Sequence, residues 1–304
     1  MHPYHIPVLL NESIKAMNLK PGGIAVDCTL GGGSHSQAIL EREPGVKLYS
    51  FDQDPDAVQH CRFLSEQYGD RFKIINDNFA NLRTRLSLER VKKIDSILFD
   101  LGVSSHQIDT DVRGFSYMRD GRLDMRMNQS GELTAEIVVN DYSKEELVRI
   151  FRELGEERES SRIAAAICKY RQEQRLATTG ELAEIIDRAT MSKLKIKART
   201  RIFQALRIFV NQELETLRTA LKDAVNILNP EGRIVVITYN SLEDRITKKY
   251  FLYEQLSCVC PVSFPRCLCS KQQRLIINPD LTPAADDKDN NRARSARLRS
   301  ATRI

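Results

Sequence analysis

Short apolar runs alternate with helical patterns over roughly the first third of the chain, as a parallel α/β sheet requires. Four of these runs have the apolar character of strands buried on both faces, and they predict strands at Ile24–Cys28, Leu48–Phe51, Phe72–Ile75 and Ser96–Phe99. Three of the runs end at or run into an acidic residue, namely Asp27, Asp52 and Asp100. Because ligands of open α/β sheets bind beyond the carboxyl ends of the strands, these carboxylates define a candidate site.

Helix signals without an intervening strand begin after about residue 112. Ser143 with Glu146, and Thr178 with Glu181, form capping-box patterns ahead of apolar residues at helical spacing. A longer apolar stripe at helical spacing follows from Phe203 to Leu228. We interpret these stripes as core positions of a helical unit.

Strand patterns return at Arg233–Thr238 and around Leu275–Ile277, so the helical unit is predicted to be an insertion within the sheet domain. We expect a core in two parts, 1–112 and 213–281, an inserted helical substrate-recognition domain at 113–212, and a polar linker with a basic tail at 282–304. The linker prediction rests on the polar stretch Thr282–Asn291.

Composition is that of an ordinary globular protein, with 304 residues, 41% hydrophobic and 29% charged. The chain has no apolar run of the roughly 18 residues that span a membrane, and MHPYHIPVLL lacks the pattern of a signal peptide, so we expect a cytoplasmic protein. Seven cysteines, an odd number, do not indicate a disulfide framework.

The net charge is only +5, but five arginines crowd the end of the chain: Arg292, Arg294, Arg297, Arg299 and Arg303. Such a tail suits phosphate, or it is a solvated terminus without a partner.

A glycine turn follows the first predicted strand, in the segment Ala25–His35 that contains Asp27, Gly31 and Gly33. The spacing differs from the dinucleotide pattern G-x-G-x-x-G, and a carboxylate at the strand end would repel a pyrophosphate. A cationic ligand such as S-adenosylmethionine fits better. Asp27 could serve its amino-acid end and Asp52 its ribose hydroxyls, although Asp52 could instead cap a helix.

Eight motifs, which together span nearly the whole length, carry a resemblance to a known family. They are His5-Ile6-Pro7-Val8-Leu9-Leu10, Asp27-Cys28-Thr29-Leu30-Gly31-Gly32-Gly33-Ser34-His35-Ser36, Asp100-Leu101-Gly102-Val103-Ser104-Ser105, Arg113-Gly114-Phe115-Ser116, Leu123-Asp124-Met125-Arg126-Met127, Phe203-Gln204-Ala205-Leu206-Arg207-Ile208, Ser241-Leu242-Glu243-Asp244-Arg245 and Arg292-Ala293-Arg294-Ser295-Ala296. In these motifs the chain resembles the bacterial ribosomal RNA small subunit methyltransferase H family, the cytidine N4-methyltransferases.

The resemblance implies a class I methyltransferase (Rossmann-like) sheet domain with an inserted all-helical domain. It implies S-adenosylmethionine as cofactor and N4 of a cytidine in the decoding centre (P site) of 16S ribosomal RNA, within the small ribosomal subunit, as substrate. The residues to which it assigns cofactor contacts are Gly33, Ser34, His35, Asp52, Phe79, Asp100 and Gln107.

Three features depart from the family pattern: the family usually has glycine at Ser34 and histidine at Asn240, and its common His-Pro ahead of the Phe203 motif is replaced here by Lys197-Ala198. We place Asp100 and Asn240 in the catalytic site, but Asn240 cannot act as a proton acceptor with a near-neutral pKa. A cytosine N4 amine is a poor nucleophile, and Asp100 could accept one of its hydrogens. The alternative for Asp100 is that it caps the backbone donors of its loop.

Cations alternate with aromatic residues between Arg113 and Asn128, which is typical of segments that bind single-stranded or flipped RNA. An ordinary surface loop is the alternative. The residues that we expect to contact RNA are Arg113, Phe115, Arg122, Arg126, Arg292 and Arg294.

Two cysteine pairs near the end, Cys258 with Cys260 and Cys267 with Cys269, are a candidate zinc site. Their spacing is shorter than the usual C-x₂₋₄-C, so we favour a hairpin of partly buried thiols and expect no metal.

The sequence also leaves alternatives for the function: a methyltransferase for another base, a cofactor-binding ribosome assembly factor without turnover, or an oxidoreductase that uses NAD. Whether the chain forms a homodimer stays open.

Overall fold

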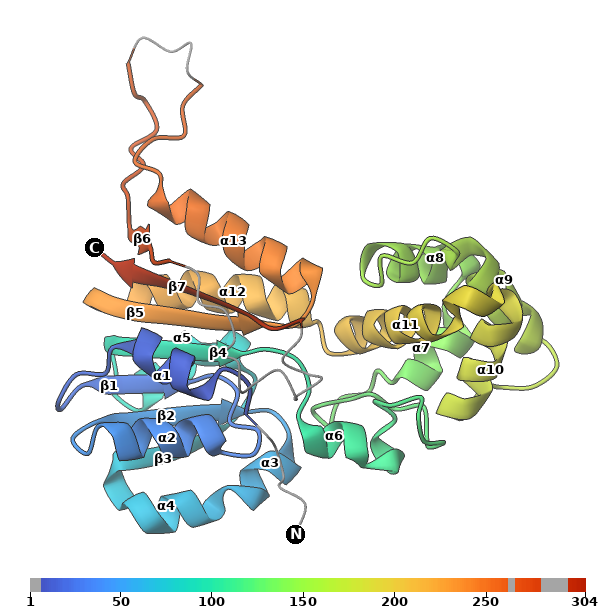
Figure 1. The fold of residues 1–304 in the computed structure, drawn as a ribbon, viewed down its shortest axis with the longest axis horizontal. Helices are drawn as coiled ribbons and strands as arrows, with labels where there is room; N and C mark the ends of the chain where they lie inside the picture. The colour runs from blue at the N-terminus through green and yellow to red at the C-terminus, as the bar shows by residue number, and fades with distance from the viewer. Residues whose placement is uncertain (1–6, 262–265, 280–294) are drawn as a thin grey trace. The chain divides into compact units, whose positions relative to one another are not determined.

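The computed structural model describes residues 7–261, 266–279 and 295–304. The chain forms two compact units, one built from the residues up to Gly102 and from Leu214 onward, the other from Val103–Glu213 (Figure 1). Each unit has its own buried hydrophobic core. The predicted insertion, 113–212, lies within the second unit.

A seven-stranded sheet in the order β3-β2-β1-β4-β5-β7-β6 organises the first unit. Its strands are β1 (Ile24–Asp27), β2 (Lys47–Asp52), β3 (Phe72–Asn76), β4 (Ile94–Asp100), β5 (Leu228–Thr238), β6 (Leu275–Ile277) and β7 (Arg297–Arg303). The first five run parallel, and β7 is antiparallel to both of its neighbours. The six predicted strands are confirmed. Strand order reverses between β1 and β4, where open α/β sheets bind ligands.

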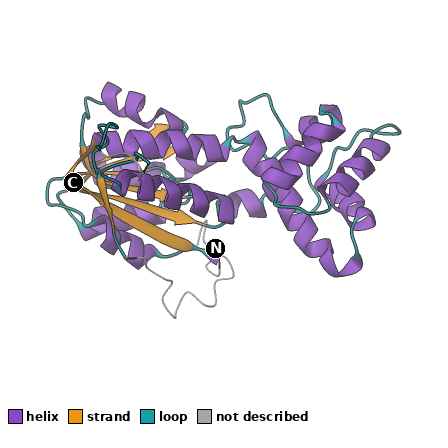
Figure 2. Cartoon of the chain, turned by 90° about the horizontal axis from the view of Figure 1, so that it is seen from above, coloured by secondary structure: helices purple, strands orange, loops and turns teal. Residues whose placement is uncertain are grey.

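Helices cover both faces of this sheet, because each face presents apolar side chains (Figure 2). The helices of the first unit are α1 (Leu10–Met17), α2 (Ser34–Arg42), α3 (Pro55–His60), α4 (Arg62–Tyr68), α5 (Leu82–Leu88), α12 (Glu213–Ile227) and α13 (Ser241–Gln255). Residues of α1, α2 and α4 pack in one core cluster, and residues of α5, α12 and α13 pack in another.

The second unit, which is described throughout, has helices as its regular elements. They are α6 (Ser105–Asp109), α7 (Ala135–Asp141), α8 (Lys144–Glu153), α9 (Ser160–Tyr170), α10 (Thr179–Ala189) and α11 (Lys195–Val210), with short 3₁₀ turns at Asp111–Arg113 and Ser192–Leu194. The capping boxes of Ser143 and Thr178 are confirmed at the starts of α8 and α10. The long stripe from Phe203 is divided between α11 and α12, because Gln212 has a positive φ of 49° that interrupts the helix.

The end of the chain corrects one prediction. We expected a basic tail there, but Arg297–Arg303 form β7, hydrogen-bonded between β5 and β6. Leu298 and Ala301 are buried in the sheet, and the Asp244 carboxylate pairs with Arg297 at 3.1 Å and with Arg299 at 2.6 Å. The predicted linker Thr282–Asn291 lies outside the described residues.

Among the described residues, the helices are all too short or too polar to cross a bilayer.

Candidate active site

The glycine turn after β1 is built around the buried carboxylate of Asp27. The Ser36 hydroxyl donates to Oδ2 at 2.7 Å, and the backbone N–H of Thr29 donates to Oδ1 at 3.0 Å. Gly33 precedes α2 with φ 81°, and a Cβ there would lie 2.9 Å from Leu64 Cδ1. The positive φ and the close Leu64 and Cys61 side chains together favour glycine at this position.

Asp52, at the end of β2, connects the first two strand ends. Its Oδ2 accepts from the backbone N–H of Gly31 at 2.8 Å, and its Oδ1 accepts from Asp54 N–H at 2.9 Å. The N-cap of α3 is Asp54, so the alternative in which Asp52 caps that helix is wrong. Asp52 therefore lies against the glycine turn, where the sequence places it.

Asp100, at the end of β4, is held from several sides. The Tyr239 hydroxyl, at the end of β5, donates to Oδ1 at 2.8 Å, and His35 Nδ1 lies 3.6 Å from Oδ2. The backbone N–H of Asp100 donates to the Thr29 hydroxyl at 2.8 Å, and Thr29 also contacts Asp27. The acidic ends of β1 and β4 thus belong to one hydrogen-bonded network.

Burial makes this network receptive to positive charge. Desolvation raises the pKa of Asp27 to about 7, against the Ser36 hydrogen bond, which lowers it. Desolvation also raises the pKa of Asp100 to about 7, while the Tyr239 hydroxyl lowers it and the charges of Asp27 and Glu243 raise it. A bound cation would relieve this repulsion, so the residues fit the sulfonium and ammonium groups of S-adenosylmethionine.

Tyr239 is the site residue that the sequence did not reveal. Its only local signal is its position directly after a buried strand, while its partner Asp100 is distant in the chain. Asn240 follows it as the N-cap of α13, and its side-chain oxygen accepts from the backbone N–H groups of Leu242 and Glu243 at 3.0 Å each. The Asn240 side-chain oxygen thus caps the helix. A catalytic role for Asn240 stays a prediction.

The other expected cofactor residues have varied surroundings. Ser34 is the first residue of α2, and its φ is not positive, so a hydroxymethyl group is tolerated where the family usually has glycine. Phe79, just past β3, packs edge-to-face on Phe99 with ring centroids 5.7 Å apart. Gln107 belongs to the second unit, where it forms a capping box with Ser104 at the start of α6.

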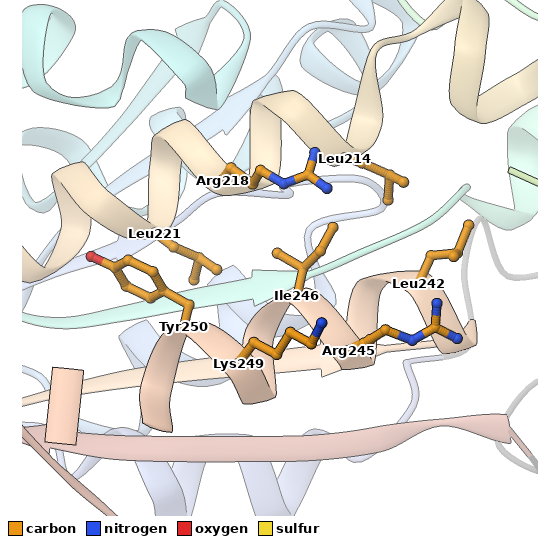
Figure 3. Close-up of a pocket in the computed structure, with 8 residues that line it drawn as sticks. All are labelled: Leu214, Arg218, Leu221, Leu242, Arg245, Ile246, Lys249 and Tyr250. Atoms are coloured by element: carbon orange, nitrogen blue, oxygen red, sulfur yellow. The ribbon is translucent and has the colours of Figure 1, made fainter. Parts of the chain in front are cut away.

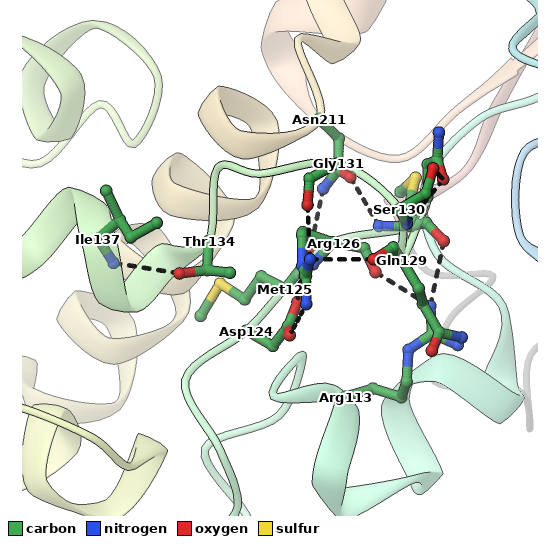
Figure 4. A network of polar contacts seen from close by, with 12 residues as sticks. Arg113, Asp124, Met125, Arg126, Gln129, Ser130, Gly131, Thr134, Ile137 and Asn211 are labelled. Carbon is green, nitrogen blue, oxygen red and sulfur yellow. Dashed lines mark hydrogen bonds and ion pairs between the residues drawn. The ribbon is translucent and has the colours of Figure 1, made fainter.

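Two of the expected RNA contacts, Arg113 and Arg126, have partners within the second unit (Figure 4), and their part in RNA binding stays a prediction. The buried guanidinium of Arg113 donates to the carbonyl oxygens of Arg126 and Met127. The Arg126 guanidinium pairs with Asp124 at 2.6 Å and donates to the Gly131 carbonyl at 2.5 Å. Both side chains therefore hold together the loop that carries them.

Of the remaining expected RNA contacts, Arg122 is exposed and Phe115 packs partly buried against the helical core. Arg292 and Arg294 lie outside the described residues. The four candidate metal ligands lie together between α13 and β6.

A pocket of about 390 Å³ lies between α12 and α13 (Figure 3), and one of its lining residues, Leu242, donates its backbone N–H to Asn240. Its lining combines apolar side chains with three basic ones, and it consists of Leu214, Arg218, Leu221, Leu242, Arg245, Ile246, Lys249 and Tyr250.

The strand order, together with acidic side chains at the ends of β1, β2 and β4, defines a class I methyltransferase fold with an inserted helical unit. The chain matches the MraW methylase family over residues 2–304 and belongs to that family. S-adenosylmethionine is therefore its cofactor, as the strand-end carboxylates and the family resemblance predict.

Relatives are similar over nearly their full lengths. The chain is 47% identical over 305 residues to ribosomal RNA small subunit methyltransferase H of Carboxydothermus hydrogenoformans, with 99% of this chain and 98% of that protein covered. It is 44% identical over 307 residues to the protein of the same name from Finegoldia magna, with 99% and 98% covered. The crystal structure of an rRNA methylase from Streptococcus thermophilus matches with a TM-score of 0.43 at 11% identity, covering 97% of this chain and 93% of that chain.

Proposed function

We propose that this methyltransferase transfers a methyl group from S-adenosylmethionine to N4 of a cytidine in the decoding centre of 16S ribosomal RNA. The names of the relatives support a small-subunit ribosomal RNA substrate. The observation that carries the choice of an amino group is the largely buried Asp100 carboxylate, which the Tyr239 hydroxyl holds at the end of β4.

Asp100 would act on the amine itself. The N4 lone pair is delocalised into the cytosine ring, and a carboxylate that accepts an N4 hydrogen localises it on nitrogen. S-adenosylmethionine supplies an activated methyl group when bound. Holding N4 in line with that methyl carbon at about 3–3.5 Å removes a large part of the barrier. Because burial raises the pKa of Asp100 above that of a free carboxyl, Asp100 can take up the proton that N4 loses.

The cofactor would lie over the glycine turn. Gly31 and Gly33 allow the backbone of the turn to approach the cofactor closely. The buried Asp27 contributes negative charge, and Asp52 accepts hydrogen bonds from the ribose hydroxyls. We assign Ser34, His35, Phe79 and Gln107 to the surroundings of the cofactor on the family resemblance.

RNA binding would use the basic residues that remain available. Arg122 is exposed, Phe115 offers an aromatic ring, and Arg292 and Arg294 add positive charge near the end of the chain. Such contacts give salt-dependent affinity without sequence choice, which then comes from the pocket that reads the cytosine edge. The inserted helical unit favours the assembled small subunit over free RNA as substrate.

Mass spectrometry of small-subunit RNA from cells with and without the protein tests the proposal. We expect one N4-methylated cytidine that disappears with the gene and returns with the native chain but not with Asp100→Asn. If the gene is instead required for methylation of another base, or of DNA, the proposed cytidine target is wrong. Full restoration of the methylated cytidine by Asp100→Asn would remove Asp100 from the chemistry.

A further inference from the structure

The chain between α13 and β6 forms a long excursion, residues 256–274, which we call the cysteine loop. It leaves the end of α13 as one arm and returns to β6 as another (Figure 1). At its base the buried Glu254 carboxylate pairs with Arg274 at 2.5 Å and with Lys271 at 3.5 Å. The described parts of the loop are 256–261 and 266–274, so each cysteine pair belongs to one described arm.

The two arms bring four sulfur atoms together. The Sγ atom of Cys267 lies 3.5 Å from that of Cys258 and 3.5 Å from that of Cys269. The Sγ atoms of Cys258 and Cys269 are 3.8 Å apart, and all four, including that of Cys260, lie within 4.8 Å of one another. Each arm therefore contributes two sulfurs to one compact group.

These separations match a tetrahedral metal site. Four sulfurs at about 2.3 Å from a central zinc ion stand about 3.8 Å from one another along the tetrahedron edges. A disulfide would need about 2.05 Å between sulfurs, and the four cysteines are free thiols. A multi-iron cluster would hold its ligands farther apart than a single ion does.

Backbone amides point at the sulfurs from both arms. Val259 N–H donates to Cys269 Sγ at 3.4 Å, and Leu268 N–H donates to Cys260 Sγ at 3.3 Å. These bonds cross between the arms, and Cys260 N–H donates to Cys258 Sγ at 3.4 Å within one arm. Hydrogen bonds to sulfur favour the thiolate, which is the form that binds a metal.

No residue is buried in the described parts of the cysteine loop, and its ion pairs to Glu254 lie at the base, not beside the cysteines. Val259 is 44% exposed and Leu268 is 76% exposed, so apolar packing does not hold the arms together. A segment without a core needs a covalent or metal cross-link to stay ordered. The short C-x-C spacing is no obstacle, because neither arm is a strand and the sulfurs converge from opposite arms.

We propose that Cys258, Cys260, Cys267 and Cys269 bind one zinc ion as a tetrathiolate that fixes the cysteine loop. The sequence favours a hairpin of partly buried thiols without a metal; in the structure Cys260 and Cys269 are half-buried and Cys258 and Cys267 are exposed, and the proposal adds a metal to that arrangement. Zinc replaces the thiol protons on binding, so the site forms without a redox step.

Metal content of the purified full-length chain is the first test. We expect one zinc ion per chain, and Co²⁺ added to metal-free protein should give the thiolate-to-cobalt charge-transfer and visible bands of a tetrahedral tetrathiolate site. Loss of a group that merely supports a ligand lowers metal affinity about 10- to 100-fold, so Cys258→Ser or Cys267→Ser should lower it at least as much. Cys168→Ser, in the second unit, is the matched control and should change nothing.

Proteolysis gives a readout that does not depend on the variants. Arg266 is exposed between the cysteine pairs, and zinc should slow tryptic cleavage after it in the native chain while cleavage elsewhere is unchanged. Retained S-adenosylmethionine binding shows that a variant has folded. Iron as the sole bound metal, two disulfides by mass, no bound metal, or cleavage at Arg266 that ignores zinc would each overturn the proposal.

Discussion

Removing the Tyr239 hydroxyl tests the proposed role of Asp100 most directly. In Tyr239→Phe the ring remains, and only the donor that lies 2.8 Å from Asp100 Oδ1 is lost. That hydrogen bond lowers the pKa of Asp100 against the effect of burial, so its loss raises the pKa further. Because the proposed chemistry needs the ionised carboxylate, the acid limb of the pH profile should move to higher pH.

The size of the shift follows from the strength of the bond. A hydrogen bond to a charged group contributes about 1.5–3 kcal/mol, which corresponds to about 1–2 pKa units. At a pH equal to the native pKa, the ionised fraction of Asp100 falls from half to between about a tenth and a hundredth. Activity there should fall about 5- to 50-fold and recover in alkali. The charge of the bound cofactor lowers the pKa in both proteins, so the difference between them is the quantity tested.

The assay is transfer of radiolabelled methyl groups to small ribosomal subunits at saturating cofactor, with kcat/KM measured across pH. Asp100→Asn is the matched control, because it should lose activity at every pH and show no acid limb. If Tyr239→Phe lowers activity equally at all pH values, or leaves the profile in place, then Asp100 does not work through its ionised form. A merely structural role for Tyr239 would produce the first of these results.

Four further outcomes follow from the fold and the site. Asp52→Ala should weaken S-adenosylmethionine binding about ten- to a hundredfold, since charge-assisted hydrogen bonds of ~1.5–3 kcal/mol are lost; unchanged calorimetric affinity would remove Asp52 from the site. For each carboxyl with a pKa of about 7 that must ionise when the cofactor binds, cofactor affinity should rise about tenfold from pH 6 to pH 8. Calorimetry should then detect proton release on binding. An affinity that does not change with pH would contradict the raised pKa values of Asp27 and Asp100. Without cofactor the same raised pKa values should lower stability as the pH rises from about 4 through about 7, which thermal unfolding checks. Leu298→Ala should lower the free energy of unfolding by about 2–5 kcal/mol, whereas exposed Arg297→Ala should lower it by less than about 1 kcal/mol; equal effects in denaturant would contradict the burial of β7.

The parallel part of the sheet could be predicted from the sequence because its strands carry a local signal. Strands buried on both faces are apolar throughout, and an acidic residue marks the end of β1, β2 and β4. The helix starts at Ser143 and Thr178 were equally readable, since a capping box lies within four residues.

Features that depend on distant partners could not be predicted in this way. The sequence of β7 resembles a basic tail because the charges of Arg297 and Arg299 are paired with Asp244, which lies on another element. Arg113 resembles a phosphate ligand until its carbonyl partners are known, and Tyr239 meets Asp100 only in the folded sheet. The cysteine spacing predicts a hairpin of thiols, but it does not predict that all four sulfur atoms lie within 4.8 Å of one another.

The interruption between β4 and β5 has a consequence for how the chain folds. These strands pair directly, yet the whole second unit, about 110 residues, separates them. Closing a flexible loop of that length costs about 4 kcal/mol in chain entropy before any pairing energy is gained. The second unit is continuous in sequence and has its own core, so we expect it to collapse first and turn that loop into a compact body. Assembly of the sheet, and with it of the strand-end carboxylates, would then be the late and rate-limiting phase of folding.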